Sequence, residues 1–188
     1  NVIVANYSSG NITVLKKKSD GSLNNVIQNI QHKGSSKNKE RQESSHPHMV
    51  QFSPDKKFVF ATDLGTDFIY QYTYNPSSEN QVLTIKDSVG VRKGSGPRHL
   101  TFSPNGKDAY LLNELSGTLI VYMYENDRLR KIEETQVIDD TFHGEVAAAD
   151  IHISPDGKFL YATNRAVAND ITVFEIIQHG KLLFKQFI

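Results

Sequence analysis

The sequence contains no cysteine, so neither a disulfide framework nor thiolate chemistry is available to it. Its 21 Lys and Arg residues equal its 21 Asp and Glu residues, which gives no overall field that would favour nucleic acid or an anionic membrane. No apolar run reaches the roughly 18 residues that a membrane-spanning helix needs. Helical periodicity with capping residues is nowhere sustained, which argues against alternating strands and helices. We therefore expect a soluble, cytoplasmic globular protein without α/β architecture.

One turn recurs three times along the chain. It ends the stretches "HMVQFSPDK" (48–56), "HLTFSPNGK" (99–107) and "IHISPDGK" (151–158). Setting them in register aligns Phe52 with residues 50 and 101 positions further on, and a spacing near 50 is typical of propeller blades or solenoid repeats. Within the turn, Pro presets φ at the first corner, and Asp or Asn tolerates the second.

Further strand-like runs follow each turn, with alternating apolar residues on both sides of a short polar loop. "VIVANYSSGNITVLKK" (2–17) is a fourth copy of this half, without the strand and turn that come first elsewhere. The pattern predicts an all-β fold, a β-propeller of four-stranded antiparallel blades in one domain over 1–188. The expected blades are approximately 1–31, 46–91, 97–140 and 148–188. Because the chain begins inside a strand-like run, we expect about four blades of a larger ring.

Histidine, arginine and acidic residues are predicted to gather at one end of these units. Strands in a blade alternate direction, so the start of the first strand and the loop between the second and third strands lie at the same end. The repeated turns lie at the opposite end. The residues expected to meet around the axis are His48, Arg98, His99, Glu114, Asp150, His152 and Arg165.

Three long segments resemble the seven-bladed propeller lactonases, a family that includes bacterial 6-phosphogluconolactonase and fungal carboxymuconate cyclase. They are "ERQESSHPHMVQFSPDKKFVFATDLGTD" (40–67), "GSGPRHLTFSPNGKDAYLLNEL" (94–115) and "AADIHISPDGKFLYATNR" (148–165). The resemblance implies a hydrolase of the pentose phosphate pathway that opens 6-phosphogluconolactone to 6-phosphogluconate without a metal or other cofactor. Its partners would be a phosphorylated sugar lactone and the missing blades of the same propeller, with no nucleic acid and no membrane.

The resemblance also implies roles for particular residues. By motif match, the catalytic residues fall on His48, Arg98, Glu114 and Arg165. The residues expected to contact the substrate are Arg41, His99, Asp150 and His152.

Opening a lactone needs a base that activates water and a positive group near the carbonyl oxygen. His48 or Glu114 could be the base, and Arg98 and Arg165 could hold the phosphate or the developing oxyanion. The sequence leaves these choices open. No serine nucleophile elbow is present, so direct attack by water is favoured over an acyl-enzyme.

Each assignment has a simpler alternative. Arg98 and Glu114 could be a structural ion pair, and His99 and His152 could line the channel without touching substrate. Asp150 could cap a loop or orient His152.

Three further alternatives concern the first half of the chain. Asp63 could serve only to stabilise the turn that follows it. The polar run "HKGSSKNKERQESS" (32–45) is expected to be a solvated loop, in which Arg41 and Gln42 could approach substrate. His46 and His48 could bind a metal together with His99 or His152, although the arginines would repel a cation.

Two other functions remain open for the whole chain. One is a muconate-type cycloisomerase, in which His48 or Glu114 moves a proton and the arginines bind carboxylates. The other is a non-catalytic propeller that binds a protein or polymer, because a fold alone does not define a function.

Overall fold

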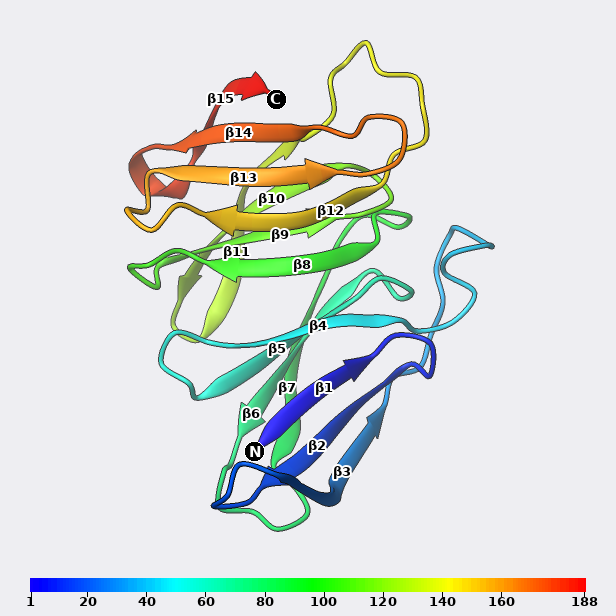
Figure 1. The fold of residues 1–188 in the computed structure, drawn as a ribbon, viewed down its shortest axis with the longest axis vertical. Coiled ribbons are helices and arrows are strands. Elements are labelled where there is room, and N and C mark those ends of the chain that lie inside the picture. The colour runs from blue at the N-terminus through cyan, green and yellow to red at the C-terminus, as the bar shows by residue number, and fades with distance from the viewer. The chain divides into compact units, whose positions relative to one another are not determined.

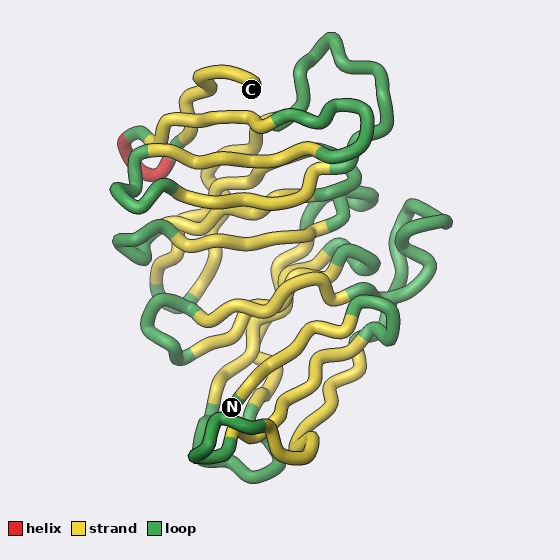
Figure 2. The backbone as a smooth tube through the Cα atoms, viewed as in Figure 1, coloured by secondary structure: helices red, strands yellow, loops and turns green.

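A computed structural model describes residues 1–188, and its regular structure is almost entirely β-strand (Figures 1 and 2). The one short helical segment is the 3-10 turn η1 (Gln178–Gly180). No helix has the length and apolar character needed to cross a bilayer. The chain divides into two compact units, Asn1–Gly94 and Ser95–Ile188.

The first unit contains two antiparallel sheets (Figure 1). A three-stranded sheet has the order β1 (Val2–Asn6), β2 (Asn11–Lys17), β3 (Leu23–Gln31). A four-stranded sheet has the order β4 (Pro47–Phe52), β5 (Phe58–Asp63), β6 (Phe68–Tyr74), β7 (Leu83–Gly90). The first sheet thus lacks the opening strand that β4 supplies to the second, as the sequence predicts.

The second unit contains two four-stranded antiparallel sheets. One has the order β8 (Pro97–Phe102), β9 (Asp108–Asn113), β10 (Thr118–Glu125), β11 (Arg128–Gln136). The other has the order β12 (Ala148–Ile153), β13 (Phe159–Asn164), β14 (Ile171–Ile176), β15 (Leu182–Phe187). The prediction of an all-β chain built from four-stranded antiparallel sheets is confirmed.

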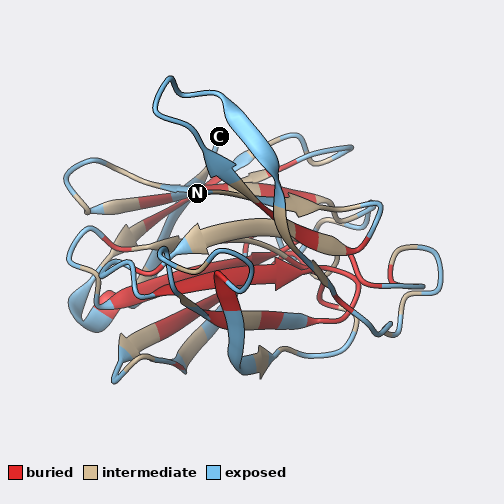
Figure 3. Cartoon of the chain, turned by 90° about the horizontal axis from the view of Figure 1, so that it is seen from below, coloured by how far each residue is buried: buried red, intermediate tan, exposed pale blue.

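In each four-stranded sheet the second strand is more buried than the last. Every residue of β5 and β9 is buried, whereas β7 and β15 are mostly exposed. Figure 3 shows strands that are buried along most of their length beside strands and loops that are exposed. In the first unit, Val59 and Ala61 of β5 pack with Ile12 and Val14 of β2. The apolar contacts between neighbouring sheets therefore hold each unit together, because a fully buried strand must be covered on both faces.

The repeated turn has the same hydrogen bonds in all three copies. In the first, the Phe58 N–H donates to Ser53 Oγ at 3.0 Å, while Ser53 Oγ donates to Asp55 Oδ1 at 2.7 Å. The two later copies repeat this arrangement around Ser103 and Ser154. The residues common to the three repeats thus form a turn that is stabilised by hydrogen bonds from its own side chains.

The position after Asp or Asn in this turn adopts a left-handed backbone. Its φ is 59° at Lys56, 70° at Gly106 and 74° at Gly157. Glycine takes this conformation without penalty, whereas a residue with a Cβ is strained there. The first copy of the turn therefore carries a strain that the two later copies avoid.

Replacing Lys56→Gly should relieve this strain and raise the free energy of unfolding by about 0.5 to 1 kcal/mol. This figure already allows for the greater conformational entropy of glycine in the unfolded chain, which opposes the gain. Urea denaturation followed by circular dichroism would measure the change. Gly106→Lys, the reverse exchange in the next copy, should lower stability by a similar amount. Equal stability of all three proteins would contradict the assignment of strain to this position.

Candidate active site

An extra residue interrupts the start of the first strand in each four-stranded sheet. Pro47 pairs with Asp63 and Met49 with Thr62, so His48 is left over in a β-bulge of β4. Arg98 occupies the equivalent bulge of β8, between paired residues Pro97 and His99. A third register slip lies in β12 between Ala148 and Ile151, and it contains Asp150. Bulges redirect side chains out of the regular alternation of a strand, and they are common beside active sites.

In the second unit, one carboxylate is shared by two arginines. Glu114 Oε2 lies 2.9 Å from Arg98 Nε and 3.1 Å from Arg165 Nη2. Glu114 follows β9 and its side chain is only 3% exposed, so both charges compensate a buried anion. The cluster of three has a net positive charge, which suits it to an anionic ligand or a developing oxyanion.

The two arginines differ in how much of their guanidinium group is available. Arg98 is 14% exposed, and its Nη1 also donates to the carbonyl oxygen of Ala149. Burial lowers the pKa of Arg98, an effect that the charge of Glu114 partly offsets. The Arg165 side chain is 52% exposed, so it presents N–H donors to solvent. The Arg98 side chain is thus enclosed by protein groups, whereas the Arg165 side chain can still bind a ligand.

A second set of ionisable groups adjoins Arg98. His99 Nδ1 lies 2.7 Å from Asp150 Oδ1, and His152 Nε2 lies 3.0 Å from Asp150 Oδ2. The Nε2 atom of His99 is 3.2 Å from Arg98 Nη1, which joins this set to the arginine cluster. Asp150 therefore lies between two histidines, in contact with both.

Burial and hydrogen bonds together determine the charge states of His99 and Asp150. Burial lowers the pKa of His99 below its ordinary 6.5, against the opposing hydrogen bond to Asp150. For Asp150, burial raises the pKa, but hydrogen bonds from His99, Ile151 and His152 outweigh it and the net shift is downward. At neutral pH a neutral His99 donates from Nδ1 to an ionised Asp150, and its Nε2 faces the Arg98 Nη1 donor at 3.2 Å.

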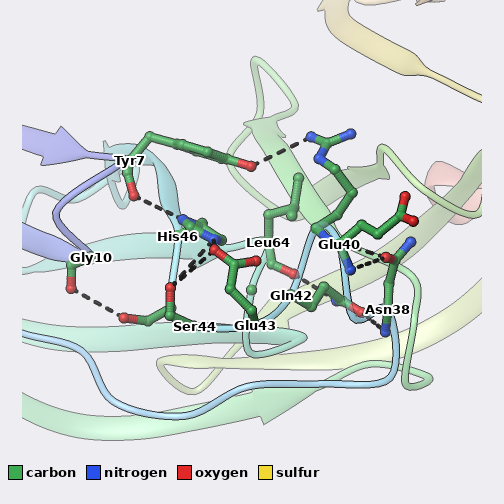
Figure 4. Close-up of polar contacts among 12 residues, drawn as sticks. Tyr7, Gly10, Asn38, Glu40, Gln42, Glu43, Ser44, His46 and Leu64 are labelled. Atoms are coloured by element: carbon green, nitrogen blue, oxygen red, sulfur yellow. Dashed lines mark hydrogen bonds and ion pairs between the residues drawn. The ribbon is translucent and has the colours of Figure 1, made fainter.

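His48 lies in an aromatic cluster of the first unit. The rings of Tyr7 and His46 are stacked with centroids 4.5 Å apart, and the Tyr7 ring meets His48 edge to face at 5.6 Å. His46 Nδ1 lies 3.0 Å from the Tyr7 carbonyl oxygen, and its Nε2 lies 3.0 Å from Glu43 Oε1 (Figure 4). Both ring nitrogens of His46 are therefore engaged within the protein. No group of three or more His, Cys, Asp or Glu side chains is arranged to hold a metal ion.

The polar loop before β4 makes specific side-chain hydrogen bonds within the first unit. Gln42 is completely buried, with Oε1 accepting from the Asn38 N–H and Nε2 donating to the Leu64 carbonyl oxygen (Figure 4). Arg41 Nη2 lies 3.4 Å from the Tyr7 hydroxyl. Most of this loop is exposed, as expected of a solvated connection, but Gln42 is buried because its amide satisfies backbone groups that water would otherwise bind.

The structure thus gathers the predicted residues into two groups. Those in the second unit form one connected network; they are Arg98, His99, Glu114, Asp150, His152 and Arg165. His48 and Arg41 lie in the first unit, each in contact with Tyr7. That His48 shares a pocket with the second group stays a prediction. Tyr7 was not expected as a site residue, although its place in a loop between two strands matches that of Glu114.

Removing the two arginines should have unequal effects on stability. Arg98→Met leaves the buried carboxylate of Glu114 poorly compensated and should cost about 3 kcal/mol, whereas Arg165→Met removes a half-exposed partner and should cost less than about 1 kcal/mol. Denaturant titration would measure both. In the double variant Arg98→Met/Glu114→Leu the buried charge is gone, and most of the loss should be recovered. Similar losses for the two single variants would contradict the asymmetry.

The His99 pKa shift predicts a pH dependence of folding. The unfolded chain binds a proton at His99 near pH 6.5, whereas the folded protein binds it only at lower pH. The contribution of neutral His99 to the free energy of unfolding is therefore complete above pH 6.5, and it is lost as pH falls below 6.5 through the lower pKa of the folded protein. His99→Gln should flatten this part of the stability curve, measured by denaturation at a series of pH values. An unchanged slope in the variant would refute the shift.

Comparison with known proteins gives one family for the whole chain. A family model described as "Lactonase, 7-bladed beta-propeller" matches residues 1–188. Among curated proteins, the chain is 37% identical over 186 residues to a 6-phosphogluconolactonase of Bacillus subtilis, covering 97% of this chain and 52% of that protein. It is 35% identical to a 6-phosphogluconolactonase of Formosa agariphila, covering 92% of this chain and 49% of that protein.

A solved structure agrees with this match. The periplasmic gluconolactonase of Pseudomonas aeruginosa superposes with a TM-score of 0.95 and 40% identity, over 99% of this chain and 53% of that one. The chain therefore spans about half the length of the relatives it matches. Since the match runs from the first residue to the last, the chain belongs to the lactonase family of seven-bladed β-propellers.

Proposed function

We propose that the protein to which this chain belongs hydrolyses a sugar lactone, and that its substrate is 6-phosphogluconolactone. The observation that carries the proposal is the pair of guanidinium groups on the buried carboxylate of Glu114. A site of this kind suits both the phosphate of the substrate and the negative charge that develops on the carbonyl oxygen. The names of the Bacillus and Formosa relatives give it independent support.

The two arginines take different roles in this proposal. Arg98 uses Nε and Nη1 for Glu114 and Ala149, so it positions the carboxylate and supplies positive charge. Arg165 is half-exposed and contacts Glu114 through Nη2, so its remaining donors bind the phosphate of the substrate. This division of roles follows from exposure, which the sequence does not reveal.

Hydrolysis requires attack of water on the lactone carbonyl carbon. A base takes one proton from the water, the bond between the carbonyl carbon and the ring oxygen breaks, and the ring oxygen receives a proton to become a hydroxyl group. We propose His48 as the base in preference to Glu114, because Glu114 Oε2 already accepts from two guanidinium groups.

The remaining proposals concern the surroundings of the enzyme. We propose a phosphorylated sugar lactone as the ligand that Arg41, His99, Asp150 and His152 contact, and no nucleic acid or membrane partner. Further blades of the same propeller would complete the ring. We propose the cytoplasm as the location, and cell fractionation tests this against the periplasm, the location named for the Pseudomonas relative.

The full-length protein should open freshly prepared 6-phosphogluconolactone faster than buffer, as measured by acid release in a pH-stat. Glu114→Gln should lower kcat about 100-fold because it disrupts the cluster that stabilises the oxyanion. Arg165→Ala should raise KM for the phosphorylated lactone at least about tenfold and change KM for unphosphorylated gluconolactone much less.

Lys158→Ala, on the exposed turn at the opposite end of its sheet, is the matched control and should keep full activity. A wild-type rate equal to that of buffer would refute the proposed function. Conversion of a carboxymuconate with no lactone opening would instead indicate the cycloisomerase. Turnover of neither substrate would favour a binding module.

A further inference from the structure

A chain of three buried side chains runs through the first unit. The Nδ1 atom of His32 lies 2.7 Å from Asp63 Oδ2, and its Nε2 lies 2.7 Å from the Tyr72 hydroxyl. All three residues are at most 6% exposed. Burial raises the pKa of Tyr72, so its hydroxyl stays protonated in this chain.

The second carboxylate oxygen of Asp63 binds backbone. Asp63 Oδ1 accepts from the N–H groups of Gly65 at 3.0 Å and Thr66 at 3.2 Å, the turn chemistry that the sequence suggests. It also accepts from the His46 N–H at 2.7 Å, while the Leu64 N–H donates back to the His46 carbonyl oxygen at 3.0 Å. Asp63 thus fastens the approach to β4 onto the turn between β5 and β6.

The turn between β5 and β6 packs closely against the segment that leads into β4. A Cβ added to Gly65 would lie 1.8 Å from the Ser44 carbonyl oxygen, so only glycine lets the segment before β4 pass there. Any shift of the turn would therefore move the residues that lead into β4. Asp63 and Gly65 together determine where β4 begins.

The other sheets supply an internal comparison. By strand pairing, the positions equivalent to Asp63 are Asn113 and Asn164. The positions equivalent to His32 are Val91 and Val137, because all three donate their N–H to the carbonyl oxygen just before β2, β6 and β10 respectively. Asn164 Nδ2 donates to the Val137 carbonyl oxygen at 2.8 Å and to Asp170 Oδ1 at 2.6 Å. An aspartate and a histidine replace asparagine and valine where the following strand, β4, carries His48.

A continuous set of contacts leads from Asp63 to His48. Asp63 holds the His46 backbone, and the His46 ring stacks on Tyr7 at 4.5 Å. Tyr7 in turn meets the His48 ring edge to face at 5.6 Å. His48 itself lies in the bulge that begins directly after Pro47, the residue paired with Asp63.

We propose that Asp63 and His32 are positioning residues that hold the bulged start of β4, and with it the ring of His48, in place for the reaction. The mechanistic part rests on the proposed lactonase function. Neither residue touches the substrate in this proposal. Their carboxylate and imidazole act through the backbone of His46 and the ring of Tyr7.

The test uses the full-length protein with Asp63→Ala, which breaks all four contacts, and His32→Val, which copies Val137 and removes only the ring. Lactone opening should show kcat lowered about tenfold or more in Asp63→Ala, with KM changed less than about twofold, because a misplaced base impairs turnover more than binding. Asp63→Asn should recover most of kcat, since its amide can accept from the backbone and donate to His32 after a change of ring tautomer.

A second measurement does not depend on catalysis. In protein labelled with carbon-13 at histidine, the His48 ring signal, assigned with His48→Gln, should shift or broaden in Asp63→Ala and in His32→Val. Tyr110→Phe is the matched control: it removes a buried hydrogen bond of 3.0 Å to the Gly180 carbonyl oxygen in the other unit and should change neither kcat nor this signal.

These measurements separate the two proposals. If the wild-type protein opens no lactone, the proposed function fails, and a moved His48 signal still supports positioning of the ring. If His32→Val and a folded Asp63 variant both leave the His48 signal unchanged, the positioning proposal is overturned whatever the activity. Loss of kcat by the same factor in Tyr110→Phe would also overturn it, because general destabilisation would then explain the effect.

Discussion

The extra residue at the start of the first strand of each four-stranded sheet is the constraint on which the site depends. A regular strand would point successive side chains to opposite faces and pack both against neighbouring sheets. The bulge releases one residue from this alternation at the end of the sheet. In β4 that residue is His48 and in β8 it is Arg98, so the same backbone irregularity presents different chemistry in different blades.

Charge compensation then determines which of these side chains can be buried. Glu114 is almost inaccessible to solvent, and its burial is tolerated because two guanidinium groups meet one oxygen. Asp63 is likewise fully buried, and it is compensated by His32 and three backbone N–H groups. In both cases a buried carboxylate fixes the geometry of its neighbours. One organises an arginine cluster and the other the start of a strand.

Much of the fold and part of the site could be predicted from the sequence. The repeated turn predicts the sheets because its hydrogen bonds are local, as those around Ser53 show. The positions of Arg98 and Glu114 follow from strand direction alone. The His32–Asp63–Tyr72 chain could not be predicted, because His32 lies 31 residues from Asp63 and 40 from Tyr72. Its only sequence signal is Asp63 where the later repeats have asparagine.

The sequence by itself determined the all-β repeat, the closed turns and the end of each sheet at which reactive side chains gather, since these depend on residues close together in the chain. Tertiary structure alone decided which arginine is enclosed, which loop residues are buried and which carboxylate holds the start of β4. These properties depend on distances between segments that are remote in sequence. A residue pattern cannot specify them until the sheets have packed and excluded water from the groups between them.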